Sequence, residues 1–171
     1  NNYTEDFSDG FAEGWVTSTP ANWSVQSESY RATASLDETT SPVYGNQTWK
    51  NCEVEVAIEH VAGGSAVSGI FVRASDDFVP FVSGSAVGVL IMSWGDYSIS
   101  YQNDGTFVQG NIYGFSSMYW APGYATNVIR INIMDDALSL YCNGELVRNT
   151  THSIINDSGK IGLLINGAAS N

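Results

Sequence analysis

The side chains best suited to surface chemistry in this chain are aromatic residues that stand among carboxylates and amides. Residues 94–97 read Trp-Gly-Asp-Tyr, and residues 111–127 hold five further rings in an irregular stretch. A sugar ring packs its C–H face on a flat aromatic side chain while planar polar groups bind its hydroxyls. The alternative is that these rings only cap an open end of the fold, which suits Phe115 best. The candidate ligand-binding residues are Trp94, Asp96, Tyr97, Tyr113, Tyr119, Trp120 and Tyr124.

A single arginine, Arg73, is embedded in the apolar run of residues 67–74. In a strand it would share a face with Phe71. A cation within such a strand needs a carboxylate partner, and Asp76, Asp77 and Glu55 are the candidates. The sequence therefore predicts a structural ion pair for Arg73. Contact with a sugar hydroxyl is the alternative that adds Arg73 to the candidate ligand-binding residues.

Three glutamates alternate along one face of the strand expected at residues 49–59, namely Glu53, Glu55 and Glu59. Glycoside hydrolysis needs two carboxylic acids about 5–10 Å apart, so a carboxylate row could carry that reaction. A solvated acidic face explains the same pattern without any chemistry, and the sequence favours this explanation. No catalytic residue is therefore predicted.

Cysteine and histidine chemistry is poorly represented. Cys52 and Cys142 each fall in phase with apolar neighbours, so both thiols should face inward. Two buried free thiols and a disulfide that closes a long loop remain equally open. His60 and His152 are the only histidines, and neither lies in a ligand or nucleophile motif. Nucleophilic triads and zinc sites are therefore not expected.

The acidity of the chain limits its partners. The 171 residues include 6 basic and 18 acidic side chains, which gives a net charge of −12 and a pI near 4.1. Such a surface repels nucleic-acid phosphates and anionic lipids, whereas a neutral polysaccharide or a divalent cation is compatible with it. No apolar run approaches the roughly 18 residues of a membrane-spanning helix. The chain starts without methionine or signal peptide, so we interpret it as one domain, residues 1–171, excised from a longer exported protein.

Period-two alternation dominates the sequence and predicts an all-β fold. The separators are pairs such as Asp104-Gly105 and Asn143-Gly144, which are hairpin signals, so the sheets should be antiparallel. Residues 86–92 are apolar on both faces, as in a central strand covered from two sides. The expected strands are residues 23–25, 30–34, 49–59, 67–74, 86–94, 97–103, 128–134, 137–141, 145–147 and 160–165.

Three segments resemble concanavalin A-like jelly rolls, and in particular laminin G-like modules. Residues 68–78 read Ser-Gly-Ile-Phe-Val-Arg-Ala-Ser-Asp-Asp-Phe, residues 6–15 begin with Asp-Phe and end with Gly-Trp, and residues 138–147 with 159–163 look like the closing hairpin and penultimate strand. The resemblance covers most of the chain. It implies a two-sheet antiparallel jelly-roll sandwich with Trp15, Trp23 and Trp49 in the core.

The same resemblance bears on enzymes and metals. The glucanase branch carries Glu-x-Asp with a further Glu two or three residues on, all on a concave strand, whereas here Glu55 replaces the Asp and Glu59 lies four residues beyond it. A keto-disaccharide hydrolase branch also resembles the segment around Arg73. Similar modules hold a structural calcium ion near the N-terminus, which makes Glu5, Asp6 and Asp9 the candidate metal ligands. The family often closes with an Asp-bearing strand that pairs with the N-terminal one, and this sequence leaves open whether the protein has that strand.

These observations favour a secreted, non-catalytic carbohydrate-binding module of an extracellular enzyme or surface adhesin. Its expected partners are a polysaccharide or glycan and the other domains of the parent protein. A glycoside-active enzyme and a structural or protein-binding spacer of a surface protein are the two alternatives. Fold alone does not separate them. Exposure of Trp94 and its neighbouring rings would favour binding, because a spacer needs no exposed aromatic cluster.

Overall fold

The computed structural model describes residues 3–17, 22–35, 39–60, 66–80, 82–107, 112–115, 125–153 and 155–167. Within these residues no helix has the length and hydrophobicity that a membrane crossing requires. The strands are β1 (Trp15–Thr17), β2 (Trp23–Val25), β3 (Tyr30–Ala32), β4 (Thr39–Thr40), β5 (Pro42–Trp49), β6 (Cys52–Ile58), β7 (Ala66–Ala74), β8 (Ala86–Met92), β9 (Asp96–Asn103), β10 (Thr106–Phe107), β11 (Ile112–Phe115), β12 (Asn127–Met134), β13 (Ala137–Cys142), β14 (Glu145–Thr151) and β15 (Gly159–Gly167).

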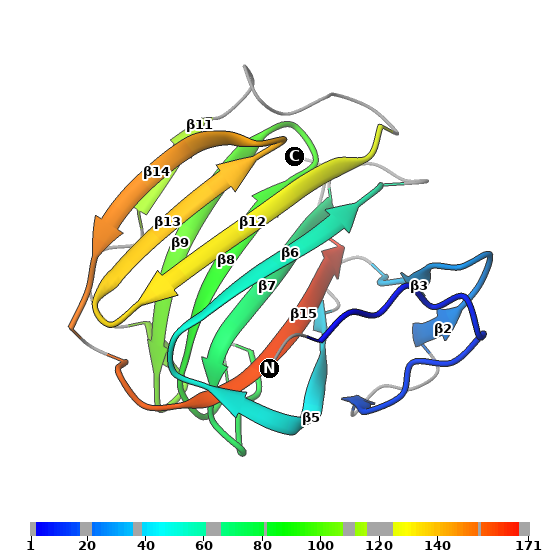
Figure 1. Cartoon of the computed structure of the whole chain (residues 1–171), viewed down its shortest axis with the longest axis horizontal. Coiled ribbons are helices and arrows are strands. Elements are labelled where there is room, and N and C mark those ends of the chain that lie inside the picture. Colours follow the sequence, from blue (N-terminus) through cyan, green and yellow to red (C-terminus); the bar gives the residue numbers. More distant parts are fainter. Residues whose placement is uncertain are drawn as a thin grey trace.

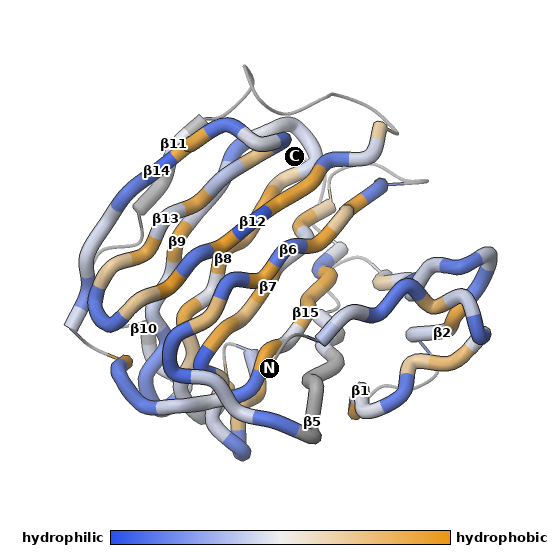
Figure 2. The backbone as a smooth tube through the Cα atoms, viewed as in Figure 1, coloured by the Kyte–Doolittle hydropathy of each residue, from blue (hydrophilic) through white to orange (hydrophobic). Residues whose placement is uncertain are grey.

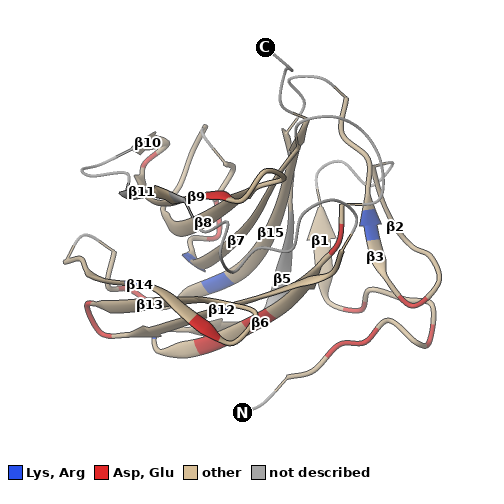
Figure 3. Ribbon diagram, turned by 90° about the horizontal axis from the view of Figure 1, so that it is seen from above, with Lys and Arg blue, Asp and Glu red and all other residues tan. Residues whose placement is uncertain are grey.

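Two antiparallel sheets stack face to face (Figure 1). The larger sheet has nine strands in the order β1-β5-β15-β7-β8-β9-β10, with β4 added on β15 and β11 on β9. The smaller has four strands in the order β14-β13-β12-β6. Figure 3 shows the two layers edge-on. The predicted two-sheet antiparallel jelly-roll sandwich is confirmed.

Alternation along the strands places the core between the sheets. In β12, Ile129, Ile131 and Ile133 are fully buried, whereas Arg130 and Asn132 between them reach the outer face. Figure 2 shows the resulting alternation of hydrophobic and hydrophilic positions along β12 and β6. The isoleucines pack against inward-facing residues of β7, β8 and β9 in one continuous cluster. Burial of this apolar surface is the main force that holds the two sheets together.

The central strands of the larger sheet are buried on both faces, as the apolar run at residues 86–92 predicted. On the outer face, Phe71, Phe78 and Leu164 belong to a second apolar cluster, and the Phe71 and Phe78 rings lie 4.7 Å apart. A Cβ on Gly88 would lie 2.6 Å from the Phe71 ring. Gly88 therefore allows Phe71 to lie flat over β8.

Two predicted hairpin turns are present. Asp104 and Gly105 have φ angles of 50° and 73°, and Asn143 and Gly144 have φ angles of 51° and 86°. Two consecutive positive φ values match the right-handed twist of the flanking strands, which is why Asp-Gly and Asn-Gly pairs are selected there.

The N-terminal region differs from the prediction. Trp15, Trp23 and Trp49 are half-buried and none belongs to either core cluster. Trp15 and Trp23 instead pack on Tyr30, at ring-centroid distances of 6.1 and 4.9 Å, and Phe7 packs on the same ring at 5.4 Å. The β2–β3 hairpin thus has an aromatic cluster of its own beside the sandwich (Figure 1).

Several short edge strands were not predicted, because two to four residues hold too little period-two signal. They are β1, β4, β10 and β11. The strand expected at residues 49–59 is in fact the end of β5, a turn at Lys50 and Asn51, and β6. Residues 111–127, expected to be irregular, contain β11.

The two cysteines are free thiols. Cys52 pairs with Ile133 on one side of β12, and Cys142 pairs with Ile129 on the other. Four residues along a strand separate them by roughly 13 Å, and a disulfide needs Cα atoms within about 7 Å. Of the two alternatives left open by the sequence, the structure has the buried thiols, and burial raises the pKa of each to about 11.

Candidate functional site

The sandwich has two chemically different ends. We call the end with the β8–β9 turn the Trp94 end, and the opposite end, where β7 finishes, the Arg73 end. The start of β7 lies at the Trp94 end, because the Ser93 amide donates to the Ala66 carbonyl at 2.9 Å. The last residue of β11, Phe115, pairs with Asp96 at this same end.

Trp94 stands exposed at the tip of the β8–β9 turn. Its side chain belongs to the exposed large hydrophobic residues, at 48 % exposure. The indole Nε1–H donates a hydrogen bond of 2.6 Å to the Asp96 carboxylate. The turn itself closes with the Gly95 amide bonded to the Met92 carbonyl at 2.9 Å, and Gly95 has a φ of 99°. A short turn and a charge-assisted hydrogen bond therefore fix the orientation of an accessible ring.

Tyr97 does not join this site, which corrects the prediction. It is 5 % exposed and points into the core between the sheets. Strand β9 starts at Asp96, so Tyr97 takes the inward position of the alternation. Its ring lies directly over Gly114 of β11, where a Cβ would collide with it. Tyr97 is a core residue at the start of β9, directly after the turn that holds Trp94.

The other predicted rings are placed only in part. Tyr113 pairs with Ser98 in β11, and its backbone alone is described. Tyr119, Trp120 and Tyr124 lie outside the described residues.

Arg73 is the most densely bonded side chain at the opposite end. It is 2 % exposed, and its nitrogens donate to oxygens from three separate connections between strands. Nε donates to Lys50 O at 2.7 Å, Nη1 to Ile155 O at 2.7 Å and Asn156 Oδ1 at 3.1 Å, and Nη2 to Asp135 O at 2.7 Å and Asn51 Oδ1 at 3.4 Å. All five N–H groups are thereby used.

The predicted ion pair of Arg73 is wrong. Its five acceptors are backbone carbonyls and amide oxygens, while Asp76 bonds Lys160 at 2.9 Å. Backbone geometry explains the difference, because Arg73 has a φ of 55° and lies where the β7–β15 register shifts. That bulge turns the guanidinium away from the face of Phe71 and toward the smaller sheet. Burial lowers the pKa of Arg73, and the Cys52 thiol and the carboxylates of Asp135 and Asp136 oppose this shift.

The glutamate row lies on an open surface. Glu53, Glu55 and Glu59 are all exposed on the outer side of β6, and β6 is an edge strand of the smaller sheet. Glu53 faces Arg130, at 3.9 Å, and accepts a hydrogen bond from Asn132 at 3.3 Å. On the larger sheet, β7, β8 and β15 contain no Asp or Glu. The described residues therefore place no carboxylate pair on the central strands.

The predicted calcium ligands are engaged locally. Glu5 accepts from the Phe7 amide at 2.8 Å, and Asp6 and Asp9 each accept from the amide two residues further on, at 3.0 and 2.9 Å. Such bonds stabilise turns in the extended N-terminal segment. Within the described part of the chain, no three Asp, Glu, His or Cys side chains gather as metal ligands. The arrangement gives the predicted calcium site no support.

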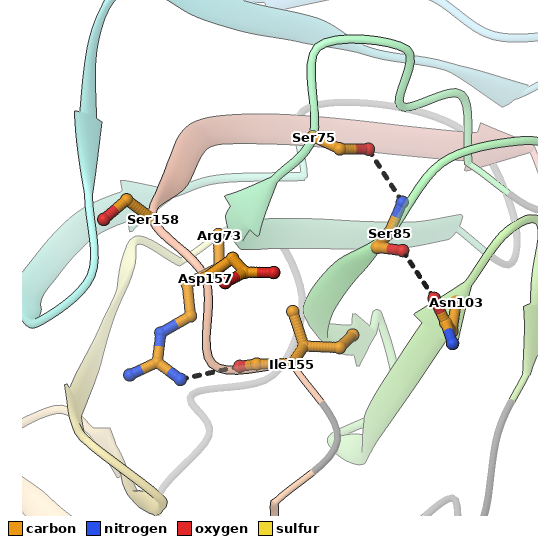
Figure 4. A pocket seen from close by; sticks show the side chains of 7 residues that line it. All are labelled: Arg73, Ser75, Ser85, Asn103, Ile155, Asp157 and Ser158. Atoms are coloured by element: carbon orange, nitrogen blue, oxygen red, sulfur yellow. Dashed lines mark hydrogen bonds between the residues drawn. The ribbon is translucent and has the colours of Figure 1, made fainter.

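A cavity of about 160 Å³ opens at the Arg73 end, between the β7–β8 loop, the end of β9 and the β14–β15 connection. In Figure 4 the Asp157 carboxylate and the Ile155 side chain point into the space beside Ser75, Ser85 and Asn103. Its lining residues are Arg73, Ser75, Ser85, Asn103, Ile155, Asp157 and Ser158.

Sequence reasoning missed this cavity. Its polar residues, apart from Arg73, stand at strand ends and in connections, where serine, asparagine and aspartate are ordinary turn residues. Only the shared location in space distinguishes them, and no spacing along the sequence reports it.

No protein-family model matches the chain, and no curated protein matches it either. Solved structures do. A carbohydrate-binding module, CBM66, from Bacillus subtilis aligns with a TM-score of 0.67 at 15 % identity, over 90 % of this chain and 88 % of that one. The Bacillus licheniformis β-glucanase gives a TM-score of 0.73 at 14 % identity, over 98 % and 89 %. A family 16 endo-glucanase from Bacteroides ovatus gives 0.70 at 9 % identity, over 96 % and 85 %.

These neighbours are a non-catalytic binding module and two glucanases, and their sequence identities establish a shared fold alone. The resemblance seen in the sequence is thus confirmed at the level of the fold. The chain has the concanavalin A-like jelly-roll fold, within which both carbohydrate binding and glycoside chemistry occur.

Proposed function

We propose that this domain is a non-catalytic carbohydrate-binding module whose glycan packs on Trp94. The observation that carries the proposal is the exposure of Trp94. Of the described tryptophans, Trp15, Trp23 and Trp49 are half-buried, and Trp94 alone is exposed. Hydrophobic residues that are exposed singly are common on protein surfaces, but Trp94 is also held in one orientation, because its indole N–H donates to the Asp96 carboxylate.

The chemistry around Trp94 suits a sugar. The hydrogen bond to Asp96 holds the indole in one orientation, which reduces the entropy lost when a ligand stacks on it. The second oxygen of that carboxylate can accept a hydrogen bond from a sugar hydroxyl. The predicted rings of Tyr113, Tyr119, Trp120 and Tyr124 belong to the chain segment that follows β9, and we include them in the proposed binding surface.

The absence of a carboxylate pair on the central strands supports binding over catalysis. Hydrolysis of a glycosidic bond needs an acid and a second carboxylate on opposite sides of that bond. Glu53 and Glu55 lie two residues apart on the exposed outer face of β6, an edge strand of the smaller sheet. The glucanase neighbours keep a glycoside-active enzyme as the second candidate, with Glu53 and Glu55 as the residues to test.

We further propose that the module acts outside the cell, attached to other domains of an enzyme or surface adhesin. The acidic, lysine-poor composition is compatible with that setting. A spacer or protein-binding domain is the remaining alternative, and it requires no ligand on Trp94.

The test is a binding screen of soluble and insoluble polysaccharides by affinity electrophoresis and calorimetry, with and without calcium. These methods do not depend on tryptophan fluorescence, so Trp94→Ala can be compared directly with the parent domain. We expect Trp94→Ala to weaken binding at least tenfold, about 1.4 kcal/mol, because the stacking surface is lost. Phe11→Ala removes an exposed aromatic side chain elsewhere and should leave binding unchanged.

Two outcomes would overturn the proposal. Equal binding by the parent domain and Trp94→Ala would remove Trp94 from the site, and failure to bind any glycan would favour the spacer. Release of reducing sugar that is lost in Glu53→Gln or Glu55→Gln would instead establish the enzyme.

A further inference from the structure

The cavity at the Arg73 end has walls held by hydrogen bonds. The Ser75 hydroxyl accepts from the Ser85 amide at 2.8 Å and donates to Asp77 at 2.7 Å. The Ser85 hydroxyl donates to Asn103 Oδ1 at 2.8 Å (Figure 4). Gln102 then ties the β7–β8 loop to β9, because its Nε2 donates to the Val79, Ser83 and Gly84 carbonyls. The cavity is therefore preorganised rather than formed by loose side chains.

The network leaves two groups available to a ligand. Because the Ser85 hydroxyl is directed at Asn103 Oδ1, the two N–H donors of Asn103 Nδ2 point elsewhere. Among the described residues, neither this NH₂ group nor the Asp157 carboxylate has a hydrogen-bond partner; Asn103 and Asp157 both line the cavity and are exposed. Arg73 offers no donor, since all five of its N–H groups are used. Ile155 adds an apolar surface next to Asp157.

The Asp157 carboxylate, the Asn103 amide and the Ile155 side chain together favour one class of ligand. A carboxylate accepts hydrogen bonds from two neighbouring hydroxyls while an amide donates to a third oxygen, and an aliphatic side chain contacts C–H groups. A net charge of −12, together with Asp157 itself, disfavours an anionic ligand. A volume of about 160 Å³ corresponds to roughly five waters at about 30 Å³ each. The cavity thus fits one small neutral polyol and not an extended chain.

We propose that this cavity is a second carbohydrate subsite, which binds the terminal residue of a neutral glycan through Asp157 and Asn103. The ligand class deepens the proposed carbohydrate-binding function, but the site is separate from it. Strand β7 runs from the Trp94 end to the Arg73 end over nine residues, about 25–30 Å. One module could therefore bind two glycan chains: one that packs along Trp94, and one whose terminal sugar residue enters the cavity at the Arg73 end.

The test uses isotope-labelled protein titrated with the methyl glycosides of glucose, galactose, mannose and fructose, at millimolar concentrations. We expect at least one glycoside to shift the Asn103 side-chain NH₂ signals and the backbone signals of residues 155–158. Asp157→Ala should weaken that binding at least tenfold, and Asn103→Ala should weaken it severalfold. Glu145→Ala removes an exposed carboxylate from the β13–β14 hairpin and should leave the affinity unchanged.

The two proposals fail separately. Trp94→Ala should weaken polysaccharide binding at least tenfold and leave the Asn103 shifts intact. Glycosides that shift only signals near Trp94, or none that shifts Asn103, would overturn the second subsite and leave the test of Trp94 unaffected. Asn103 shifts that persist unchanged in Asp157→Ala would also overturn the proposed binding mode.

Discussion

The two ends of the sandwich differ in how they place their most prominent side chain: Arg73 is buried at one end, and Trp94 is exposed at the other. At the Arg73 end, a buried cation gathers three connections by donating five hydrogen bonds. At the Trp94 end, a turn of a few residues holds a ring in solvent with one hydrogen bond. The comparison teaches that the hydrogen bonds of Arg73 and the proposed stacking surface of Trp94 lie at opposite ends, so that changes to one of these residues should leave the other intact.

Of the residues compared here, Arg73 should cause the largest loss in the free energy of unfolding when it is replaced. Arg73→Ala removes five hydrogen bonds from a buried site and leaves the Lys50, Asp135 and Ile155 carbonyls without this donor, so we expect a loss of about 3–5 kcal/mol in the free energy of unfolding. Urea unfolding of the variant and the parent measures it. Arg148→Ala, an exposed arginine on β14, is the matched control and should change stability by less than about 0.5 kcal/mol. An equal effect of both substitutions would contradict the anchoring role.

Replacement of Gln102 should have the next largest effect on stability, because its side chain bonds the β7–β8 loop to β9. Gln102→Leu keeps the approximate volume but removes the side-chain hydrogen bonds to three carbonyls, each of which still accepts from a backbone amide, so the expected cost is about 0.5–1.5 kcal/mol. Hydrogen exchange should locate the new flexibility at residues 79–84. Gln26→Leu in the β2–β3 turn, where the side chain is exposed, should cost little. Unchanged exchange in the loop would show that Gln102 does not hold it.

Acid should weaken the Arg73 end. His152 is buried, stacks on Tyr101 at 4.6 Å, and has its pKa lowered by burial and by the charge of Arg73, against an opposing effect of Asp136. Since the folded-state pKa lies below the ordinary value of 6.5, the unfolded chain takes up its proton first as the pH falls. The free energy of unfolding should therefore decrease as the pH drops below about 6.5.

Urea midpoints at pH 8, 7, 6 and 5 measure this dependence. His152→Phe keeps an aromatic ring against Tyr101 and should flatten the slope between pH 7 and 5. Burial also lowers the pKa of His60, so His60→Asn is the comparison that separates the two histidines. An identical slope in the parent and His152→Phe would reject the assignment to His152.

Replacement of Asp96 should have the smallest effect on glycan affinity, and it tests separately how much the fixed orientation of Trp94 contributes. Asp96→Ala frees the indole without removing it, so glycan affinity should fall only severalfold, by about 0.5–1 kcal/mol. The thermal midpoint should barely move. A loss as large as that of Trp94→Ala would mean that Asp96 contributes as much to sugar binding as the indole ring does.

Much of the fold was predictable because regular alternation reports it directly. The isoleucines of β12 and the Asp-Gly and Asn-Gly turns predicted an all-β fold with antiparallel sheets from local pattern, and the resemblance to jelly rolls added the two-sheet sandwich. The sequence placed Trp94 beside a predicted turn but left its exposure open. Short edge strands escaped prediction, since their positions depend on the neighbour with which they pair.

The errors share a physical cause. Strict alternation placed Arg73 beside Phe71, but a one-residue bulge with a φ of 55° reversed its direction. Tyr97 was predicted to lie in the turn, but β9 already begins at Asp96, so Tyr97 takes an inward-facing position of the strand and is buried. The cavity around Asn103 and Asp157 required the meeting of connections distant in sequence, which no local pattern encodes.

The acceptors of Arg73 have an evolutionary consequence. Three of them are main-chain carbonyls, at Lys50, Asp135 and Ile155, and every amino acid offers such an oxygen. Mutations at these positions can therefore accumulate without removing the anchor. The connections of such a domain can drift in sequence until ancestry is no longer readable, while the shape persists.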